Sequence, residues 1–154
     1  AMLNEQLLRR IRRGMFCAVT YAILDEKSGQ VSWSAAGNFA PLVFGSSRVD
    51  PMEDSGGPPL GIFPQTPWKD STELLQRGEG ILLFTDGVTE ARTEKGEMFE
   101  QERLLSAVEK TSEESPRGMI EAIQQEVAAF RGGMPPNDDC TLIAMTYQPH
   151  KAGE

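Results

Sequence analysis

The sequence predicts an α+β fold in a single domain. The chain has 154 residues, which is enough for one domain that buries roughly two thirds of its unfolded surface. Three observations support the class: β-forming segments joined by polar turns in the first half, two segments of helical periodicity in the second half, and a last β-forming segment near the end. No repeat or linker divides the chain, so we expect one domain over residues 1–154, with an ordered core at about 3–147.

A helix and a hairpin are expected first. Leucine and isoleucine recur at helical spacing over residues 3–13, and Gly14 is expected to end this helix. Residues 16–24 are rich in β-formers, and the polar segment 25–29 has the composition of a turn. A return strand over 30–36 would complete the hairpin.

Three further strands are expected before the helical part. Residues 41–44 and 68–75 have the composition of short strands, and the four consecutive apolar residues 81–84 predict a buried strand. The intervening residues 45–59 contain many Ser, Gly, Pro and Asp residues, so we expect a loop there.

Two helices and a last strand complete the expected fold. The first helix is expected over residues 101–110. The second begins with Ser115 as its N-cap and Pro116 in its first turn, and Gly132 ends it. Its apolar stripe indicates core packing. Residues 140–147 then predict the final strand.

Composition argues against several classes of function. The net charge of −8 argues against general nucleic-acid binding, and the basic cluster at residues 9–13 is interpreted as a solvated helix face rather than a phosphate-binding patch. The only histidine, His150, lies in a polar tail, which argues against histidine-dependent nucleophilic catalysis and against a zinc site. No apolar run approaches the ~18 residues of a membrane helix, and the first residues lack the pattern of a secretory signal, so we expect a cytoplasmic protein.

The two cysteines, Cys17 and Cys140, lie inside apolar patterns far apart in the sequence. We expect packed, unpaired thiols, with a disulfide or a nucleophilic cysteine as the alternatives. Carboxylates are therefore the main candidates for chemistry.

Three aspartates lie next to predicted strands. Asp86 follows the buried strand 81–84, and Asp138 and Asp139 precede the last strand. A carboxylate at the end of a buried strand needs compensation, which a hydrogen-bonded turn or a divalent cation can supply. If the two strands pair, the carboxylates converge at one sheet edge, where they repel unless one is protonated or a cation such as Mg²⁺ or Mn²⁺ lies between them. Spacing alone leaves both interpretations open: turn residues, or a site for two metal ions.

Five segments, in the same order along the chain, resemble the metal-dependent serine/threonine phosphatases of the PPM (type 2C) class, in its bacterial SpoIIE-like subgroup. The 78–91 segment contains the Thr-Asp-Gly motif at residues 85–87. Each segment alone is a weak signal, but their common order is specific. The other four segments are residues 15–16, 34–38, 57–61 and 138–141.

This resemblance implies an α-β-β-α sandwich of antiparallel sheets with a two-metal centre, usually of Mn²⁺ or Mg²⁺. A metal-held water would attack a phosphoserine or phosphothreonine without a covalent intermediate. Asp86 and Asp138 match metal-binding aspartates of the family and would be the catalytic residues, and Asp139 occupies the next position as a third candidate metal ligand. The subgroup also implies a phosphoprotein substrate of the anti-sigma-factor-antagonist type and an upstream sensor or receiver domain.

Two departures from the family pattern qualify these expectations. Asn38 stands where the family usually has histidine, and no motif that could supply a metal-bridging aspartate precedes Leu3. We therefore expect the C-terminal two thirds of a phosphatase domain, inactive alone and prone to form homo-oligomers through bared surfaces. The alternative is a non-catalytic, phosphatase-like module that binds a regulatory protein. A plain structural domain is the third interpretation, which wide separation of Asp86 and Asp138 would favour.

Overall fold

The computed structural model describes residues 2–12, 14–53 and 56–149, which form two compact units. The first unit comes from the segments within 1–40 and 53–75 together with Pro149, and the second from 41–52 and 76–148. In chain order the elements are α1 (Met2–Arg10), β1 (Val19–Leu24), β2 (Gln30–Ala36), β3 (Leu42–Gly45), β4 (Arg48–Pro51), β5 (Ser71–Leu74), β6 (Gly80–Phe84), α2 (Asp86–Thr89), α3 (Glu100–Lys110), α4 (Pro116–Arg131) and β7 (Leu142–Thr146).

The first unit is built on an antiparallel sheet of three strands in the order β1-β2-β5. β1 and β2 form the expected hairpin, and one face of β2 is buried through Val31, Trp33 and Ala35. The helix α1 is tied to the loop before β5 by the buried side chain of Asn4. Its Nδ2 donates to the carbonyl of Phe63 at 2.9 Å, and its Oδ1 accepts from the backbone N–H of Gly61 at 2.7 Å.

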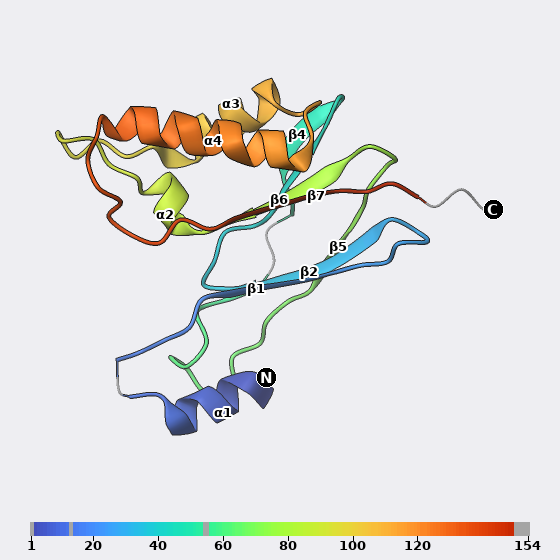
Figure 1. Ribbon diagram of the computed structural model, residues 1–154. Helices are drawn as coiled ribbons and strands as arrows, with labels where there is room; N and C mark the ends of the chain where they lie inside the picture. The colour runs from blue at the N-terminus through green and yellow to red at the C-terminus, as the bar shows by residue number, and fades with distance from the viewer. Residues whose placement is uncertain (1, 13, 54–55, 150–154) are drawn as a thin grey trace. The chain divides into compact units, whose positions relative to one another are not determined.

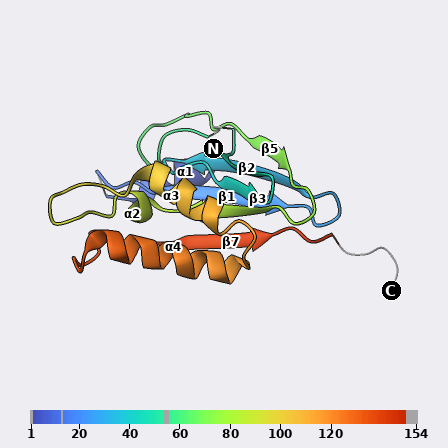
Figure 2. The ribbon, with the colours of Figure 1, turned by 90° about the horizontal axis from the view of Figure 1, so that it is seen from above.

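The second unit is an antiparallel sheet of four strands in the order β4-β3-β6-β7, with α3 and α4 over one face (Figure 1). Seen from above in Figure 2, α4 runs alongside β7, on which it packs. The apolar stripes of the two helices and the inward side chains of the sheet form one hydrophobic core. Its members include Leu42, Phe44, Leu82, Phe84, Val88, Leu104, Val108, Met119, Ile123 and Val127.

The limits of α4 follow from local chemistry. Ser115 precedes the helix in an extended conformation, and its side chain accepts a hydrogen bond from the backbone N–H of Gly118. Pro116 occupies the first turn, where its missing N–H costs nothing. At the other end Gly132 adopts a left-handed conformation with φ of 61°, which favours glycine and stops the helix. These are the start and stop signals that the sequence predicts.

A buried carboxylate closes the end of the sheet where β6 begins. Glu79 accepts two hydrogen bonds from the guanidinium of Arg48, at 2.9 and 3.0 Å, and one from the backbone N–H of Gln76 at 2.7 Å. This bidentate pair joins the β3–β4 turn to the entry of β6. Burial by itself raises the pKa of Glu79, but the hydrogen bonds from Arg48 and Gln76, with the charge of Arg48, outweigh it and hold the pKa below its ordinary value.

Comparison with the sequence-based predictions confirms the α+β class and its antiparallel sheets, with two corrections. The segment 45–59 is not wholly a loop, because Arg48–Pro51 pairs with β3 as the edge strand β4. Proline at the end of that strand is tolerated because it lies on an edge. The Thr-Asp-Gly motif is not a plain turn, because Thr85 is the N-cap and Asp86 the first residue of the short helix α2. Among the described residues, no helix combines the length and apolar character needed to cross a membrane.

The expectation of packed cysteines is wrong, because Cys17 and Cys140 are both exposed. Both are free thiols, as expected. Each lies just outside a strand rather than within one, so the apolar pattern around it does not carry it into a core. Arg13 of the basic cluster and the tail residue His150 lie outside the described residues.

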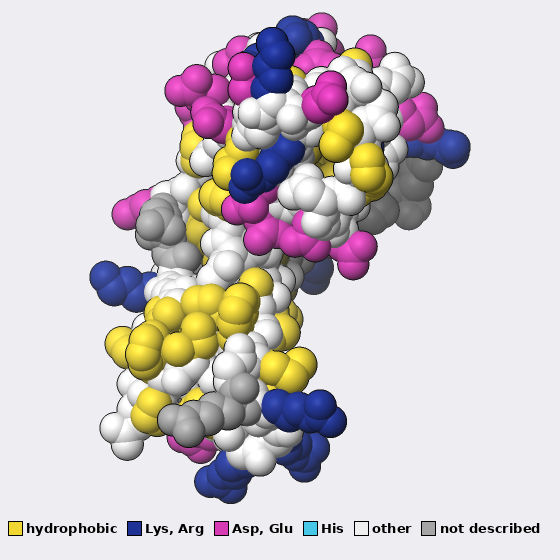
Figure 3. Space-filling view, turned by 90° about the vertical axis from the view of Figure 1, so that its left-hand side faces the viewer, with side chains coloured by type: hydrophobic (Ala, Val, Ile, Leu, Met, Phe, Trp, Pro, Cys, Tyr) yellow, Lys and Arg dark blue, Asp and Glu magenta, His cyan; other side chains and the backbone are white. Residues whose placement is uncertain are grey.

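The first unit exposes many large hydrophobic side chains. Tyr21 and Ile23 of β1 and Leu74 of β5 are each more than half exposed. In Figure 3, hydrophobic side chains gather into a patch on the face shown. The other exposed large hydrophobic residues of this unit are Met2, Leu3, Met15, Phe16, Phe39, Ile62 and Phe63.

Candidate functional site

The end of β6 and the start of β7 meet at one edge of the four-stranded sheet. The two strands are antiparallel, and their last ladder pair joins Phe84 to Leu142. Asp86 is the first residue of α2, just past β6, and Asp138 and Asp139 lie in the loop that enters β7. Pairing of the strands therefore brings the two acidic segments to one edge, as the sequence predicts. The interpretation that depends on their being far apart loses its support.

The hydroxyl of Thr85 joins the two segments beyond the ladder. It donates to the backbone carbonyl of Asp139 at 3.1 Å and accepts from the backbone N–H of Thr141 at 3.0 Å. The backbone N–H of Thr85 also donates to the carbonyl of Thr141 at 3.2 Å. Thr85 and Asp139 are 54 residues apart in sequence, so one side chain fixes the relative position of two distant segments.

Gly87 allows the loop before β7 to lie against α2. A Cβ at this buried position would lie 2.8 Å from the carbonyl carbon of Asp139 and closer still to its oxygen. Any side chain would therefore push the two acidic segments apart. A second link comes from Asn137, whose Nδ2 donates to the carbonyl of Glu90 at 3.1 Å.

The three carboxylates are exposed and lack cationic partners. Asp86, Asp138 and Asp139 all face solvent. Asp138 Oδ1 accepts a hydrogen bond from the backbone N–H of Asp139 at 2.7 Å. In the part of the chain that the structure describes, none of the three forms a salt bridge with lysine or arginine. Negative charge is thus concentrated at this edge without internal compensation.

These side chains fit part of a metal site. Carboxylate oxygens are the donors that hard divalent cations such as Mn²⁺ and Mg²⁺ prefer. However, residues 2–12, 14–53 and 56–149 contain no group of three His, Cys, Asp or Glu side chains placed to hold one ion together. The edge formed by Asp86, Asp138 and Asp139 can contribute ligands, but it does not form a closed coordination shell.

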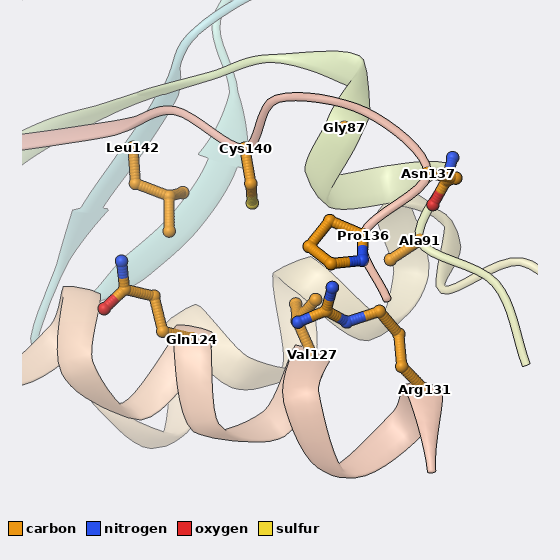
Figure 4. A pocket seen from close by; sticks show the side chains of 9 residues that line it. All are labelled: Gly87, Ala91, Gln124, Val127, Arg131, Pro136, Asn137, Cys140 and Leu142. Atoms are coloured by element: carbon orange, nitrogen blue, oxygen red, sulfur yellow. The ribbon is translucent and has the colours of Figure 1, made fainter. Parts of the chain in front are cut away.

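A cavity of about 220 Å³ lies behind this edge, between α2, α4 and the loop before β7. Figure 4 shows the side chains of Cys140 and Leu142 pointing toward α4, and the side chain of Arg131 reaching back toward Pro136. Cys140 is exposed as a residue, but it lines this cavity, and the partial burial of its thiol raises the pKa, an effect that the nearby positive charge of Arg131 opposes in part. A thiol with a raised pKa is a weak nucleophile at neutral pH, which argues against cysteine catalysis here.

The sequence named the three aspartates as candidate ligands, and it did not reveal the residues that hold their segments together. The roles of Thr85 and Gly87 depend on contacts with a segment distant in sequence, although their place beside Asp86 after a buried strand was a usable signal. Arg131 is visible in the sequence only as a cation in the last turn of a helix, where it favourably meets the helix dipole.

Comparisons with known proteins agree on the family. Residues 1–148 match the family model described as stage II sporulation protein E (SpoIIE). Among curated proteins, the phosphoserine phosphatase RsbU of Bacillus subtilis is 29% identical over 145 residues, which cover 93% of this chain and 42% of RsbU. Protein IcfG of Synechocystis is 28% identical over 132 residues, which cover 85% of this chain and 20% of IcfG. The chain thus spans less than half the length of either relative.

Solved structures share the fold. The SpoIIE phosphatase domain of Bacillus subtilis, presoaked with manganese, matches with a TM-score of 0.72 at 14% identity, over 99% of this chain and 75% of that one. The RsbU and RsbW domains of a Mycobacterium tuberculosis protein match with a TM-score of 0.74 at 21% identity, over 97% and 41%. RsbX in complex with magnesium matches with a TM-score of 0.58 at 16% identity, over 93% and 61%.

Proposed function

The chain belongs to the SpoIIE family, and from that premise we propose that it is part of a metal-dependent phosphatase acting on phosphoserine or phosphothreonine of a regulatory protein. The observation that carries the proposal is that the segments of Asp86 and of Asp138–Asp139 meet at one sheet edge, where none of the three carboxylates has a cationic partner among the described residues. Carboxylates that lie close together for structural reasons are normally paired with a cationic side chain or fully hydrogen-bonded. Carboxylates that bind a metal ion lack such a cationic side chain, because the ion supplies the positive charge.

In this proposal Asp86 and Asp138 are metal ligands, and Asp139 is the third candidate. Bound Mn²⁺ or Mg²⁺ would supply a polarised phosphoryl oxygen and an activated water. The protein's own contribution is placement. The Thr85 hydroxyl and the bare backbone of Gly87 hold the two acidic segments in contact, so the segments do not have to be brought together when an ion binds.

We further propose that this chain alone is inactive or nearly so. Its described residues offer no set of three metal-ligating side chains, and a two-metal centre needs more ligands than this edge provides. The chain would act as the C-terminal two thirds of a phosphatase domain within a longer protein, with a sensor or receiver domain upstream. The length of the curated relatives, of which this chain spans 20% and 42%, supports that arrangement.

The proposed substrate is a phosphoprotein of the anti-sigma-factor-antagonist type, acted on in the cytoplasm. Support comes from RsbU, a phosphoserine phosphatase, and from the mycobacterial structure in which an RsbU domain and an RsbW domain occur together. The net charge of −8 argues against nucleic acid as the partner.

The decisive experiment is turnover of a phosphoserine peptide in Mn²⁺ by this chain and by a version extended at its N-terminus. We expect activity only from the longer protein. Within it, Asp86→Asn and Asp138→Asn should each reduce kcat/KM at least about 100-fold, because each removes a ligand charge from the metal centre. Asp50→Asn, an exposed aspartate on β4, is the matched control and should have no effect. Robust turnover by the short chain would refute the claim of inactivity.

A non-catalytic binding module is the alternative. The absence of a three-ligand group among the described residues favours it, as does Asn38 in place of the family's histidine. The two proposals differ in metal binding by the extended protein. Titration calorimetry should detect Mn²⁺ binding by the extended protein, and Asp86→Asn should abolish it. If no such binding is detected, the non-catalytic binding module becomes the better account.

Self-association of this chain is the remaining proposal about partners. Exposed Tyr21, Ile23 and Leu74 would favour burial against a second copy. Light scattering should show a mass that rises with concentration, and the double change Tyr21→Ser with Ile23→Ser should reduce that rise. A monomer at all concentrations would contradict it.

A further inference from the structure

We propose that the cavity behind the aspartate edge is a binding site for a small monocarboxylate with a short apolar body, held by Arg131. Nothing in the phosphatase proposal requires this cavity, because its lining includes none of the three aspartates. The polar and apolar parts of its wall together define the class of ligand.

The first indication is an unsatisfied donor. The Nε atom of Arg131 is buried and has no hydrogen-bond partner, and within the described ranges Arg131 makes no ion pair. A buried N–H that has lost its water hydrogen bond is destabilising unless an acceptor reaches it. In Figure 4 the guanidinium projects from α4 toward Pro136 at the wall of the cavity. An oxygen acceptor entering the cavity would meet it there.

The second indication is the mixed character of the remaining wall. Ala91, Val127, Pro136 and Leu142 offer apolar surface that favours hydrocarbon over water. The cavity of about 220 Å³ is smaller than the roughly 300–1,000 Å³ of sites for drug-sized ligands. The ligand should therefore be a short acid rather than a nucleotide or a long lipid chain.

Charge selects a carboxylate over a phosphate. The guanidinium fork matches the two oxygens of one carboxylate, which it can bind with two parallel hydrogen bonds. A phosphate dianion would need further donors. It would also lie near Asp86, Asp138 and Asp139, which have no cationic partner in the described ranges, in a protein of net charge −8. A single negative charge on an apolar body suits this combination.

The cavity also borders the segments that carry the aspartates. Gly87 follows Asp86, and Asn137 and Cys140 flank the pair Asp138–Asp139. A ligand that contacts these wall residues would therefore contact both acidic segments. Occupation should therefore shift the backbone amide resonances of Gly87 and Cys140, whether or not a metal is present.

The test is a titration of the whole chain with hexanoate, followed by the arginine Nε–H and backbone amide resonances in ¹H–¹⁵N spectra. We expect saturable shifts of Arg131 Nε–H and of Gly87 and Cys140. Hexanamide, the neutral analogue, should bind at least about tenfold more weakly because it lacks the charge that the guanidinium recognises. Inorganic phosphate should bind more weakly than hexanoate.

Two variants and a control complete the experiment. Arg131→Gln should lower hexanoate affinity at least about tenfold, and Arg131→Lys should weaken it too, since lysine keeps the charge but not the fork. If the glutamine variant does not fold, the lysine variant carries the test. Arg117→Gln, an exposed arginine on the same helix, should bind hexanoate like the original chain. The proposal is overturned if hexanoate causes no saturable shift across the millimolar range, if hexanamide or phosphate binds as well, or if both Arg131 variants keep full affinity.

Discussion

At one end of the four-stranded sheet the carboxylate of Glu79 is buried beside Arg48, whereas at the other end the carboxylates of Asp86, Asp138 and Asp139 face solvent. Glu79 receives three hydrogen bonds, two of them from a guanidinium, and its charge is matched within the fold. The aspartates have no cationic partner in the described part of the chain. A carboxylate thus stabilises the fold at one end of the sheet, whereas the carboxylates at the other end are available to bind a cation from solution.

The largest effect on stability should come from the Glu79 end. Glu79→Gln removes the charge that Arg48 binds and weakens the link between the β3–β4 turn and β6. We expect the free energy of unfolding to fall by about 1.5–3 kcal/mol. The loss is not larger because Arg48 is partly exposed and water can solvate its charge in the variant. Urea unfolding followed by circular dichroism measures it. Glu121→Gln, which breaks the exposed pair with Arg117, is the control and should cost less than about 0.5 kcal/mol.

The difference in the free energy of unfolding between the original chain and Glu79→Gln should become smaller at acidic pH. The pKa of Glu79 is held below its ordinary value of 4.5 in the folded state, so its contribution is complete above pH 4.5 and is lost as the pH falls through the folded pKa. Urea unfolding of both proteins from pH 7 down to pH 3 checks this. A constant difference over that range would show that the ionised carboxylate is not the source of the stability.

A smaller effect is expected from the hydroxyl that joins the ends of β6 and β7. Thr85→Val keeps the shape of the side chain but removes its hydrogen bonds with Asp139 and Thr141. The free energy of unfolding should fall by about 1–2 kcal/mol. Hydrogen exchange at the Thr141 amide should also become faster, whereas Thr85→Ser should retain most of its protection. Equal exchange in the valine and serine variants would mean that the hydroxyl does not hold the segments together.

The smallest effect on stability should come from the aspartates themselves. Asp86→Asn and Asp138→Asn should each change the free energy of unfolding by no more than about 0.5 kcal/mol. Neither carboxylate forms an ion pair with a described residue, and an asparagine at position 138 can still accept the backbone hydrogen bond of Asp139. Thermal unfolding of the metal-free proteins measures it. A loss as large as that from Glu79→Gln would remove the contrast between the two ends and identify the aspartates as structural.

Local signals accounted for most of the fold. Ser115, Pro116 and Gly132 set the limits of α4, and the apolar run before Asp86 gave β6. The edge strand β4 was missed because Arg48–Pro51 ends in proline and lacks an apolar run, and its pairing with β3 is a tertiary outcome. The exposure of Cys17 and Cys140 was mispredicted because hydrophobic neighbours in sequence do not fix where a strand begins.

The candidate site divides in the same way. The place of the three aspartates at strand ends was readable, and the pairing of β6 with β7 agrees with it. The contacts that join them, from Thr85 to Asp139 and from Gly87 to the same backbone, link residues distant in sequence. The unpaired Nε of Arg131 likewise arises only when α4 packs beside the loop that enters β7.

The hydrogen-bonded ladder between β6 and β7 fixes the spacing of the two acidic segments. Because strand register changes only by whole residues, this spacing cannot change gradually. Sliding one strand past the other by one residue would move Asp138 about 3.3 Å along the edge and turn the apolar side chains of β7 to the opposite face. The core beneath α4 opposes such a slip, since Leu142 and Ala144 of β7 pack against it and would be turned away. Insertions within the α3–α4 connection would leave the pairing of β6 with β7 unchanged. The helical part of the chain can therefore vary in length while the spacing between the two acidic segments stays the same.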